Sequence, residues 1–145
     1  MTKDFILSEK DGFTISTDPS KLDREMIHRF LSEDSYWAEG MTEGEVGDTM
    51  DGSLCYGVYR DELQVGFASV ETDYASYAYL TDIFIVEEYR GQGLSQWLME
   101  TILSHPDLQE LDTWMLITED AQGLYEKFGF KAIEGSPGHM ERRGH

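Results

Sequence analysis

A long, mostly apolar segment at residues 77–86 leads through a short turn to two glycines and then to a helical pattern. Apolar side chains occupy both alternating sets of positions in this segment, which is typical of a strand covered on both faces. One face is expected to carry Tyr79, Thr81, Ile83 and Ile85, and the other face Leu80, Asp82, Phe84 and Val86. A buried central strand that runs directly into a helix favours a mixed α/β sheet.

Further strands and helices are predicted on both sides of this unit. Strands are expected at residues 13–17, 53–60, 63–72 and 112–118, with Asp61-Glu62 turning the second into the third, and a last extended segment includes Met140. Helices are expected at residues 20–32, with Ser20 or Asp18 as N-cap, from the capping box Thr42-Glu43-Gly44-Glu45, at residues 94–104 before His105-Pro106, and from Asp120 to Gly129. These elements fit one domain over residues 1–145.

The charge of the chain limits its partners. The formal net charge is −18 at pH 7, so the surface repels nucleic acid and anionic membranes and attracts cations. Solubility or adaptation to salt explains the same charge. The first residues lack the pattern of a signal peptide, and no apolar run approaches the ~20 residues of a membrane span. We therefore expect a cytoplasmic protein.

The single cysteine, Cys55, excludes an internal disulfide and a multi-cysteine metal site. It lies in the apolar run Leu54-Cys55-Tyr56-Gly57-Val58-Tyr59, which favours a small buried side chain on a strand. We predict no metal site. His28 falls off the apolar stripe of its helix and is expected at the surface.

The loop Arg90-Gly91-Gln92-Gly93-Leu94-Ser95 joins the central strand to a helix N-terminus. The first N–H groups of a helix have no partner within the helix, and together with the helix dipole they attract anions. Gly91 and Gly93 would let the backbone approach a phosphate closely, and Arg90 adds a positive charge. The loop lacks the Lys-Ser/Thr pair of an ATP-binding P-loop. A glycine-rich turn into a packed helix would give the same pattern without a ligand.

Two stretches carry a family resemblance. The stretch from Phe84 to Ser95 resembles the CoA-binding motif of the GNAT N-acetyltransferase superfamily, which has Arg or Gln, two residues, Gly, one residue, and then Gly or Ala. Arg90 and Gly93 match this motif, and Ser95 takes the last small position. Residues 120–130 resemble the later motif of the family, with Tyr125 followed by the Gly-Phe pair.

The resemblance covers about residues 50–133. Shorter stretches are similar to a small bacterial GNAT subgroup of mostly uncharacterised enzymes: Tyr36-Trp37, Thr72-Asp73-Tyr74 and Tyr79-Leu80-Thr81-Asp82. The implied fold is a mixed α+β, GNAT-like one, in which about four helices flank a central, mostly antiparallel sheet. The implied sheet is splayed between the strands at 77–86 and 112–118. Acetyl-CoA would enter there as co-substrate, with Phe84 and Val86 turning backbone groups toward its pantetheine arm.

The resemblance also implies an acetyl transfer to an amine. In many members of the family, the tyrosine that matches Tyr125 serves the thiolate leaving group, although this side chain also lies on an apolar helix stripe. Asp82 is the candidate base if burial raises its pKa, and a structural ion pair or backbone hydrogen bond is the alternative. Glu71 is a second candidate base. Aromatic side chains that would line an acceptor pocket or simply pack are Tyr36, Trp37, Tyr74 and Tyr77.

The sequence is also compatible with two functions other than acetyl transfer. A GNAT-like fold that binds acyl-CoA without catalysis would act as a sensor or interaction module, and an acidic interaction domain would bind no cofactor. For an enzyme, the acceptor could be a small polyamine-like molecule, an antibiotic-like amine, or a protein lysine or N-terminus. A small amine or polyamine-like acceptor is expected, because the short chain offers no separate protein-docking segment. Many GNAT proteins are dimers, so a homodimer fits the resemblance, although no motif indicates one.

Overall fold

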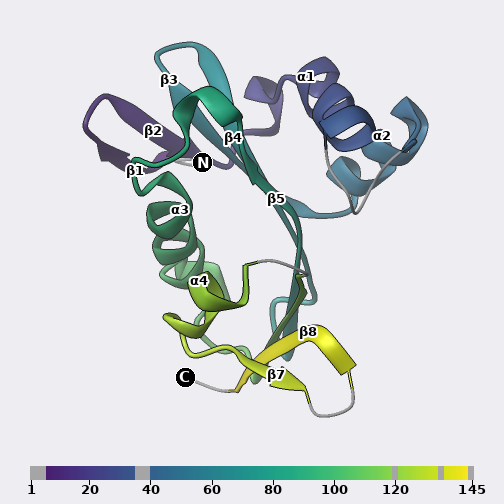
Figure 1. Ribbon diagram of the computed structural model, residues 1–145, viewed down its shortest axis with the longest axis vertical. Coiled ribbons are helices and arrows are strands. Elements are labelled where there is room, and N and C mark those ends of the chain that lie inside the picture. Colours follow the sequence, from purple (N-terminus) through teal and green to yellow (C-terminus); the bar gives the residue numbers. More distant parts are fainter. Residues whose placement is uncertain (1–5, 35–39, 119–120, 134–135, 144–145) are drawn as a thin grey trace.

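The fold is centred on one eight-stranded sheet, seen in a computed structural model that describes residues 6–34, 40–118, 121–133 and 136–143. The strand order is β1-β2-β3-β4-β5-β6-β8-β7, and only the β5–β6 pair is parallel (Figure 1). The strands are β1 (Ile6–Lys10), β2 (Phe13–Ser16), β3 (Leu54–Arg60), β4 (Leu63–Thr72), β5 (Tyr77–Ile85), β6 (Thr113–Ile117), β7 (Lys131–Ile133) and β8 (Ser136–Arg143). The mixed, mostly antiparallel sheet expected from the resemblance is confirmed.

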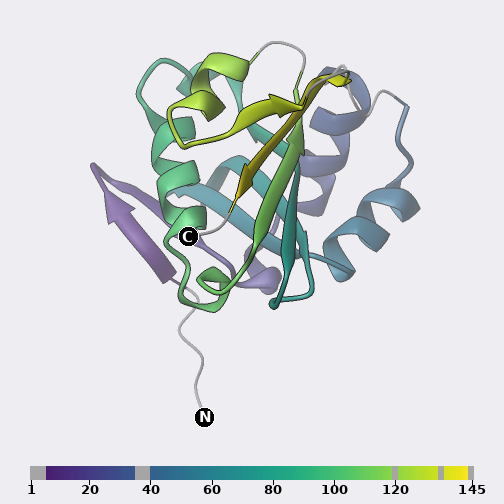
Figure 2. The same ribbon diagram turned by 90° about the horizontal axis from the view of Figure 1, so that it is seen from below.

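Helices cover both faces of this sheet. The helices α3 (Leu94–Leu103) and α4 (Gln122–Glu126) lie on one face, and α1 (Arg24–Arg29) and α2 (Glu43–Asp51) lie on the other, as Figures 1 and 2 both show. The larger apolar core lies under α3 and includes Leu98, Met99 and Ile102, each fully buried. The smaller core lies under α1 and α2 and includes Ile27 and Val46. Short 3-10 turns at Pro19–Lys21, Glu87–Tyr89 and Pro106–Leu108 connect the elements.

A β-bulge at Asp82 changes the alternation of β5. The register with β4 shifts between Phe67 and Ser69, and Asp82 has a positive φ of 53°. Leu80 before the bulge and Ile85 after it therefore pack in the same core under α3, whereas Phe84 packs in the core under α1 and α2. The predicted alternation through the whole strand is wrong, because the extra residue reverses the faces beyond Asp82.

The strands β5 and β6 separate after four paired residues. Their parallel register runs from Tyr77 opposite Thr113 to Leu80 opposite Leu116. Beyond this point, Ile117 pairs with His139 of β8, and the N–H of Thr118 donates to the carbonyl of Gly138. Pairing with β6 ends at Leu80, two residues before Asp82, so the splay that the resemblance implied begins next to the bulge.

The first helical region is shorter than the residues 20–32 predicted from the apolar stripe. Asp18 caps only the 3-10 turn, and α1 begins after Asp23, whose carboxylate accepts from the N–H of Met26 at 3.0 Å. The Asp23 N–H in turn donates to the Gln64 side chain at 2.7 Å, which fixes this break against β4. A π-helical segment, Phe30–Asp34, follows α1.

The predicted Asp120 N-cap of the helix before Gly129 lies outside the described residues.

Within the described ranges, no helix is long and apolar enough to cross a membrane.

The predicted capping box of α2 is confirmed. The Thr42 hydroxyl accepts from the N–H of Glu45, and the Glu45 carboxylate accepts from the N–H of Thr42, both at 3.2 Å. We expect Thr42→Ala to lower the free energy of unfolding by about 1 kcal/mol, because it removes one of these two bonds. Urea denaturation measures the change, and Thr42→Ser, which keeps the hydroxyl, is the control. Equal stability of the Ala and Ser variants would contradict this role.

Candidate functional site

The loop before α3 has the geometry of an anion site. Gly91 and Gly93 have φ values of 83° and 79°, a region that glycine enters without steric cost. A Cβ built on either glycine would meet no described atom within 4 Å, so the space in front of the loop is open. The first α-helical hydrogen bond runs from Trp97 N–H to Gly93 carbonyl, and among the described residues no side chain caps this helix. The N–H groups of the first turn therefore face outward as donors.

Side chains of the loop brace its backbone. The Nε of Arg90 donates to the carbonyl of Ile85 at 2.8 Å, and the Gln92 amide donates to the carbonyl of Tyr89 at 3.3 Å. Exposed Glu87 and Glu88 precede Arg90, so side-chain charge alone does not make the loop positive. An anion placed at this loop would be attracted mainly by the backbone N–H groups and the helix dipole.

The backbone groups that face the opening differ from those predicted. The N–H of Val86 donates to the carbonyl of Val65 on β4 at 2.9 Å, so the expectation that it faces the splay is wrong. Phe84 shares this direction by alternation, and its ring stacks on Phe30 with centroids 3.8 Å apart. The bulge at Asp82 therefore changes by one residue which backbone groups of β5 face the opening. The backbone groups of Ile83 and Ile85 lie on the side away from β4, and the Ile85 carbonyl reaches Arg90 there.

A cleft of about 770 Å³ occupies the place where β5 and β6 separate. One wall is β5 from Tyr79 to Ile83, and the opposite wall runs from Leu116 to Thr118. Tyr125 and Ala121 close the cleft on the α4 side. Asp48 and Thr49 of α2, Gly52, Ser53 and Glu71 line its other side. The cleft therefore reaches both faces of the sheet through the splay.

Asp82 is one of the residues that line this cleft. Its side chain is half-buried, and the left-handed backbone at this position is one that Asp and Asn tolerate better than most residues. Bulges near active sites commonly redirect a side chain, and here the bulge places Asp82 among the residues that line the opening. The predicted candidates Asp82 and Tyr125 thus line the same cleft.

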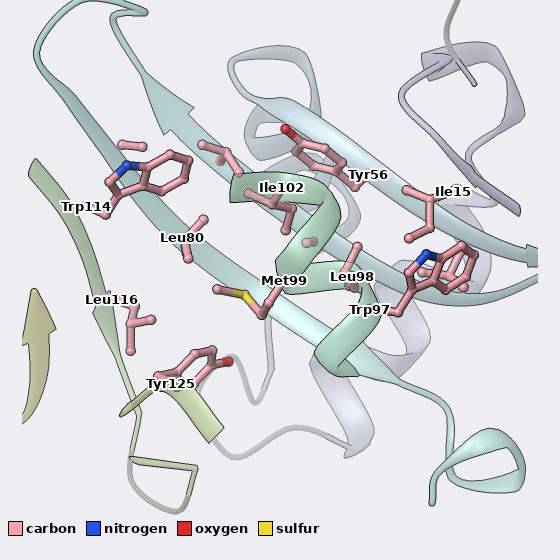
Figure 3. Close-up of a cluster of buried hydrophobic side chains, with 14 of the residues drawn as sticks. Ile15, Tyr56, Leu80, Trp97, Leu98, Met99, Ile102, Trp114, Leu116 and Tyr125 are labelled. Atoms are coloured by element: carbon pink, nitrogen blue, oxygen red, sulfur yellow. The ribbon is translucent and has the colours of Figure 1, made fainter. Parts of the chain in front are cut away.

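Tyr125 closes the cleft from α4. The residue is 7% exposed, and its ring packs edge-on against Phe130 with centroids 6.1 Å apart. Figure 3 shows the ring between Leu116 and Met99, with the hydroxyl directed away from Leu116. The ring is thus part of the core, as its place on the helix stripe predicts, while the residue also lines the cleft.

The carboxylates of the cleft influence Tyr79. Burial raises the pKa of the Tyr79 phenol, and the charges of Glu71 and Asp82 raise it further. Glu71 and Tyr79 are directly opposite each other on β4 and β5. The phenol of Tyr79 therefore stays neutral near physiological pH and lies within electrostatic range of both carboxylates.

Several other predicted residues are structural or lie elsewhere. Cys55 is buried, and desolvation raises the pKa of its thiol to about 11, so it stays protonated near neutral pH and the structural interpretation is confirmed. Tyr74 is exposed, and Tyr77 does not line the cleft. Tyr36 and Trp37 lie outside the described residues. The sequence did not identify Asp48, Tyr79 and Thr118 as cleft residues. No local pattern shows that α2 and β6 lie next to the bulge in the folded protein.

Comparison with known proteins agrees with this architecture. The family model described as an acetyltransferase (GNAT) domain matches residues 51–132, which is more than half of the chain. A Gibberella zeae protein whose name assigns it to the acetyltransferases is 29% identical over 141 residues, covering 81% of this chain and 78% of that protein. The chain belongs to the GNAT family of acetyltransferases.

Solved structures share the fold. A GNAT-family protein from Xanthomonas campestris pv. campestris is 44% identical, with a TM-score of 0.83 over 87% of this chain and 89% of that one. The PaiA N-acetyltransferase of Thermoplasma acidophilum, solved in complex with coenzyme A, is 16% identical, with a TM-score of 0.70 over 90% of this chain and 98% of that one. A GNAT acetyltransferase from Elizabethkingia anophelis with acetyl-CoA bound is 13% identical, with a TM-score of 0.63 over 92% and 99% of the two chains.

Proposed function

We propose that this chain is an N-acetyltransferase that moves the acetyl group of acetyl-CoA onto the primary amine of a small molecule, while both substrates are bound. The proposal depends on one observation, which is that strand β5 contributes both to the glycine loop and to the cleft. The end of β5 leads into the open glycine loop of α3, and the bulge in β5 places Asp82 in the cleft with Tyr125. The whole chain is proposed to act as one such domain.

The proposed donor site fits the shape of CoA. The backbone N–H groups of the loop from Gly91 to Ser95 would hold the diphosphate, because the glycine conformations leave the space in front of them open. Leu94 is buried and anchors this turn to the core. The backbone of Ile83 and Ile85 would bind the pantetheine arm in place of Phe84 and Val86. Acetyl-CoA supplies an activated acetyl thioester when bound.

The proposed chemistry needs two proton carriers. Asp82 would take a proton from the acceptor ammonium and so expose the lone pair of its nitrogen. Tyr125 would donate a hydrogen bond or a proton to the leaving sulfur, which a neutral phenol can do. The two side chains line the same cleft from β5 and from α4, so they can act on different atoms of one reaction.

The experiment that tests this function is an acceptor screen. Purified protein is mixed with acetyl-CoA and a panel of primary amines, and release of free thiol is followed together with the mass of the products. Thiol release that depends on an amine, with a gain of one acetyl group on that amine, is the expected result. Tight binding of acetyl-CoA without thiol release for any amine would overturn the enzyme and support an acyl-CoA sensor.

Asp82→Asn tests the proposed base. We expect kcat/KM to fall about 10- to 30-fold near neutral pH, because a half-exposed site lets water replace part of the base function. The residual activity is expected to rise with pH as more of the acceptor loses its proton. The control is Asp61→Asn, since Asp61 has a similar φ of 54° in the exposed β3–β4 turn. Equal activity of the two variants would show that Asp82 is structural.

A further inference from the structure

The side of the cleft next to α2 is acidic. Three carboxylates line the cleft, those of Asp48, Glu71 and Asp82. Among the described residues that line it, none is Lys, Arg or His. The cleft forms because β5 and β6 separate, and the three carboxylates give its lining a negative charge.

The three carboxylates lie at different depths. Asp82 is half-buried at the bulge, whereas Glu71 and Asp48 are exposed on β4 and α2. Because Glu71 is directly opposite Tyr79, its carboxylate lies beside an aromatic ring that also lines the cleft. A carboxylate next to an aromatic face is a favourable environment for an ammonium group.

Among the described residues, Arg24 does not neutralise this acidic wall. Arg24, on α1, is paired with Asp51 at 2.9 Å, one helical turn beyond Asp48 on α2. That ion pair is exposed on both sides, and neither residue lines the cleft. The negative potential of Asp48 and Glu71 therefore reaches a ligand in the cleft, where low-dielectric walls strengthen it.

We infer that the acceptor is a small dication of the linear diamine or polyamine class, with its reacting nitrogen at Asp82 and its second ammonium held by Glu71, Asp48 and the ring of Tyr79. This inference rests on the proposed function and adds the substrate class. In the reaction, the acceptor ammonium first gives one proton to Asp82, and the neutral nitrogen then bonds to the acetyl carbon while the carbon–sulfur bond breaks. The nitrogen loses its second proton as the amide forms, the sulfur takes one proton, and the proton on Asp82 passes to solvent. The second ammonium keeps its charge throughout, so it contributes to binding and not to the chemical step.

Three amines of equal chain length test the inference. They are 1,5-diaminopentane, pentylamine and 5-aminopentanoate, which share five carbons and end in a cationic, a neutral and an anionic group, respectively. We expect kcat/KM to be about tenfold or more higher for the diamine than for pentylamine, and lowest for the acid. The preference for the diamine should decrease as salt concentration rises, because exposed charges are screened.

Glu71→Gln separates binding of the second charge from catalysis. The ratio of kcat/KM for the diamine over pentylamine is expected to fall about three- to tenfold in this variant. The control is Glu62→Gln in the exposed β3–β4 turn, at the opposite end of β4, which should leave the ratio unchanged. Calorimetric titration of the diamine into the protein with CoA present gives a second readout that needs no turnover, and Glu71→Gln should weaken that binding to the same extent.

These measurements distinguish failure of the acetyltransferase function from failure of the dication acceptor. If no amine is acetylated, the proposed function fails. If pentylamine and the diamine are acetylated equally well, the function stands and the dication is excluded. If Glu71→Gln lowers both rates equally and leaves their ratio intact, Glu71 acts on the reacting amine as a base, and its role with the second charge is wrong.

Discussion

Gly93→Asp should weaken the binding of CoA by about 100-fold or more. At this position the backbone is left-handed, and a side chain would extend into the open space in front of the first turn of α3. A carboxylate there would compete for the same N–H groups and repel a diphosphate, an interaction of a few kcal/mol at about 4 Å near a protein surface. Isothermal titration with CoA measures the dissociation constant directly.

Gly93→Asn is the matched control. The Asn side chain has nearly the same size as Asp and tolerates the left-handed region, but it carries no charge. We expect a loss in CoA affinity of about tenfold or less, with strain of about 1 kcal/mol in both variants. Equal and unchanged affinity in the two variants would mean that the diphosphate does not lie at this loop.

Tyr125→Phe should lower kcat by about 100- to 1000-fold while the dissociation constant of CoA stays within about threefold. The change removes the hydroxyl that would serve the leaving sulfur and keeps the ring that packs on Phe130. An interaction made only in the transition state affects kcat without affecting ground-state binding. Thiol release at saturating acetyl-CoA measures kcat, and calorimetry measures the affinity.

A control variant distinguishes this loss from a general effect on the fold. Tyr77→Phe removes the hydroxyl of a half-buried residue on the same sheet that does not line the cleft, and it should keep kcat. Both variants should keep the thermal midpoint within a few degrees, since neither loses its ring. A Tyr125→Phe protein that retains kcat within threefold would show that another group protonates the sulfur.

Local sequence patterns were sufficient to predict most of the elements. The α3 stripe and the α2 capping box depend on residues three or four positions apart, and both were predicted correctly. The motif around Arg90 and Gly93 predicted the loop that precedes α3, and the structure adds that both of its glycines have positive φ. These features depend on interactions between residues that are close in sequence, which a linear pattern can capture.

Local patterns could not predict in which direction the backbone and side-chain groups of β5 point near Asp82. A bulge depends on the pairing of two strands, and nothing in the β5 sequence alone marks the extra residue against Ala68 of β4. For this reason, Val86 was assigned to the cleft although its N–H bonds to β4. The contribution of α2 to the cleft, through Asp48, likewise depends on tertiary packing and has no local signal.

The central claim is that the loop before α3 holds the diphosphate of CoA while the splay between β5 and β6 admits its thioester. A crystal structure of the protein with CoA tests it most directly. We predict diphosphate oxygens within hydrogen-bonding distance of backbone nitrogens between Gly91 and Ser95, and the sulfur in the cleft near Tyr125. A diphosphate bound elsewhere on the protein, or a thiol arm lying outside the cleft, would contradict the account.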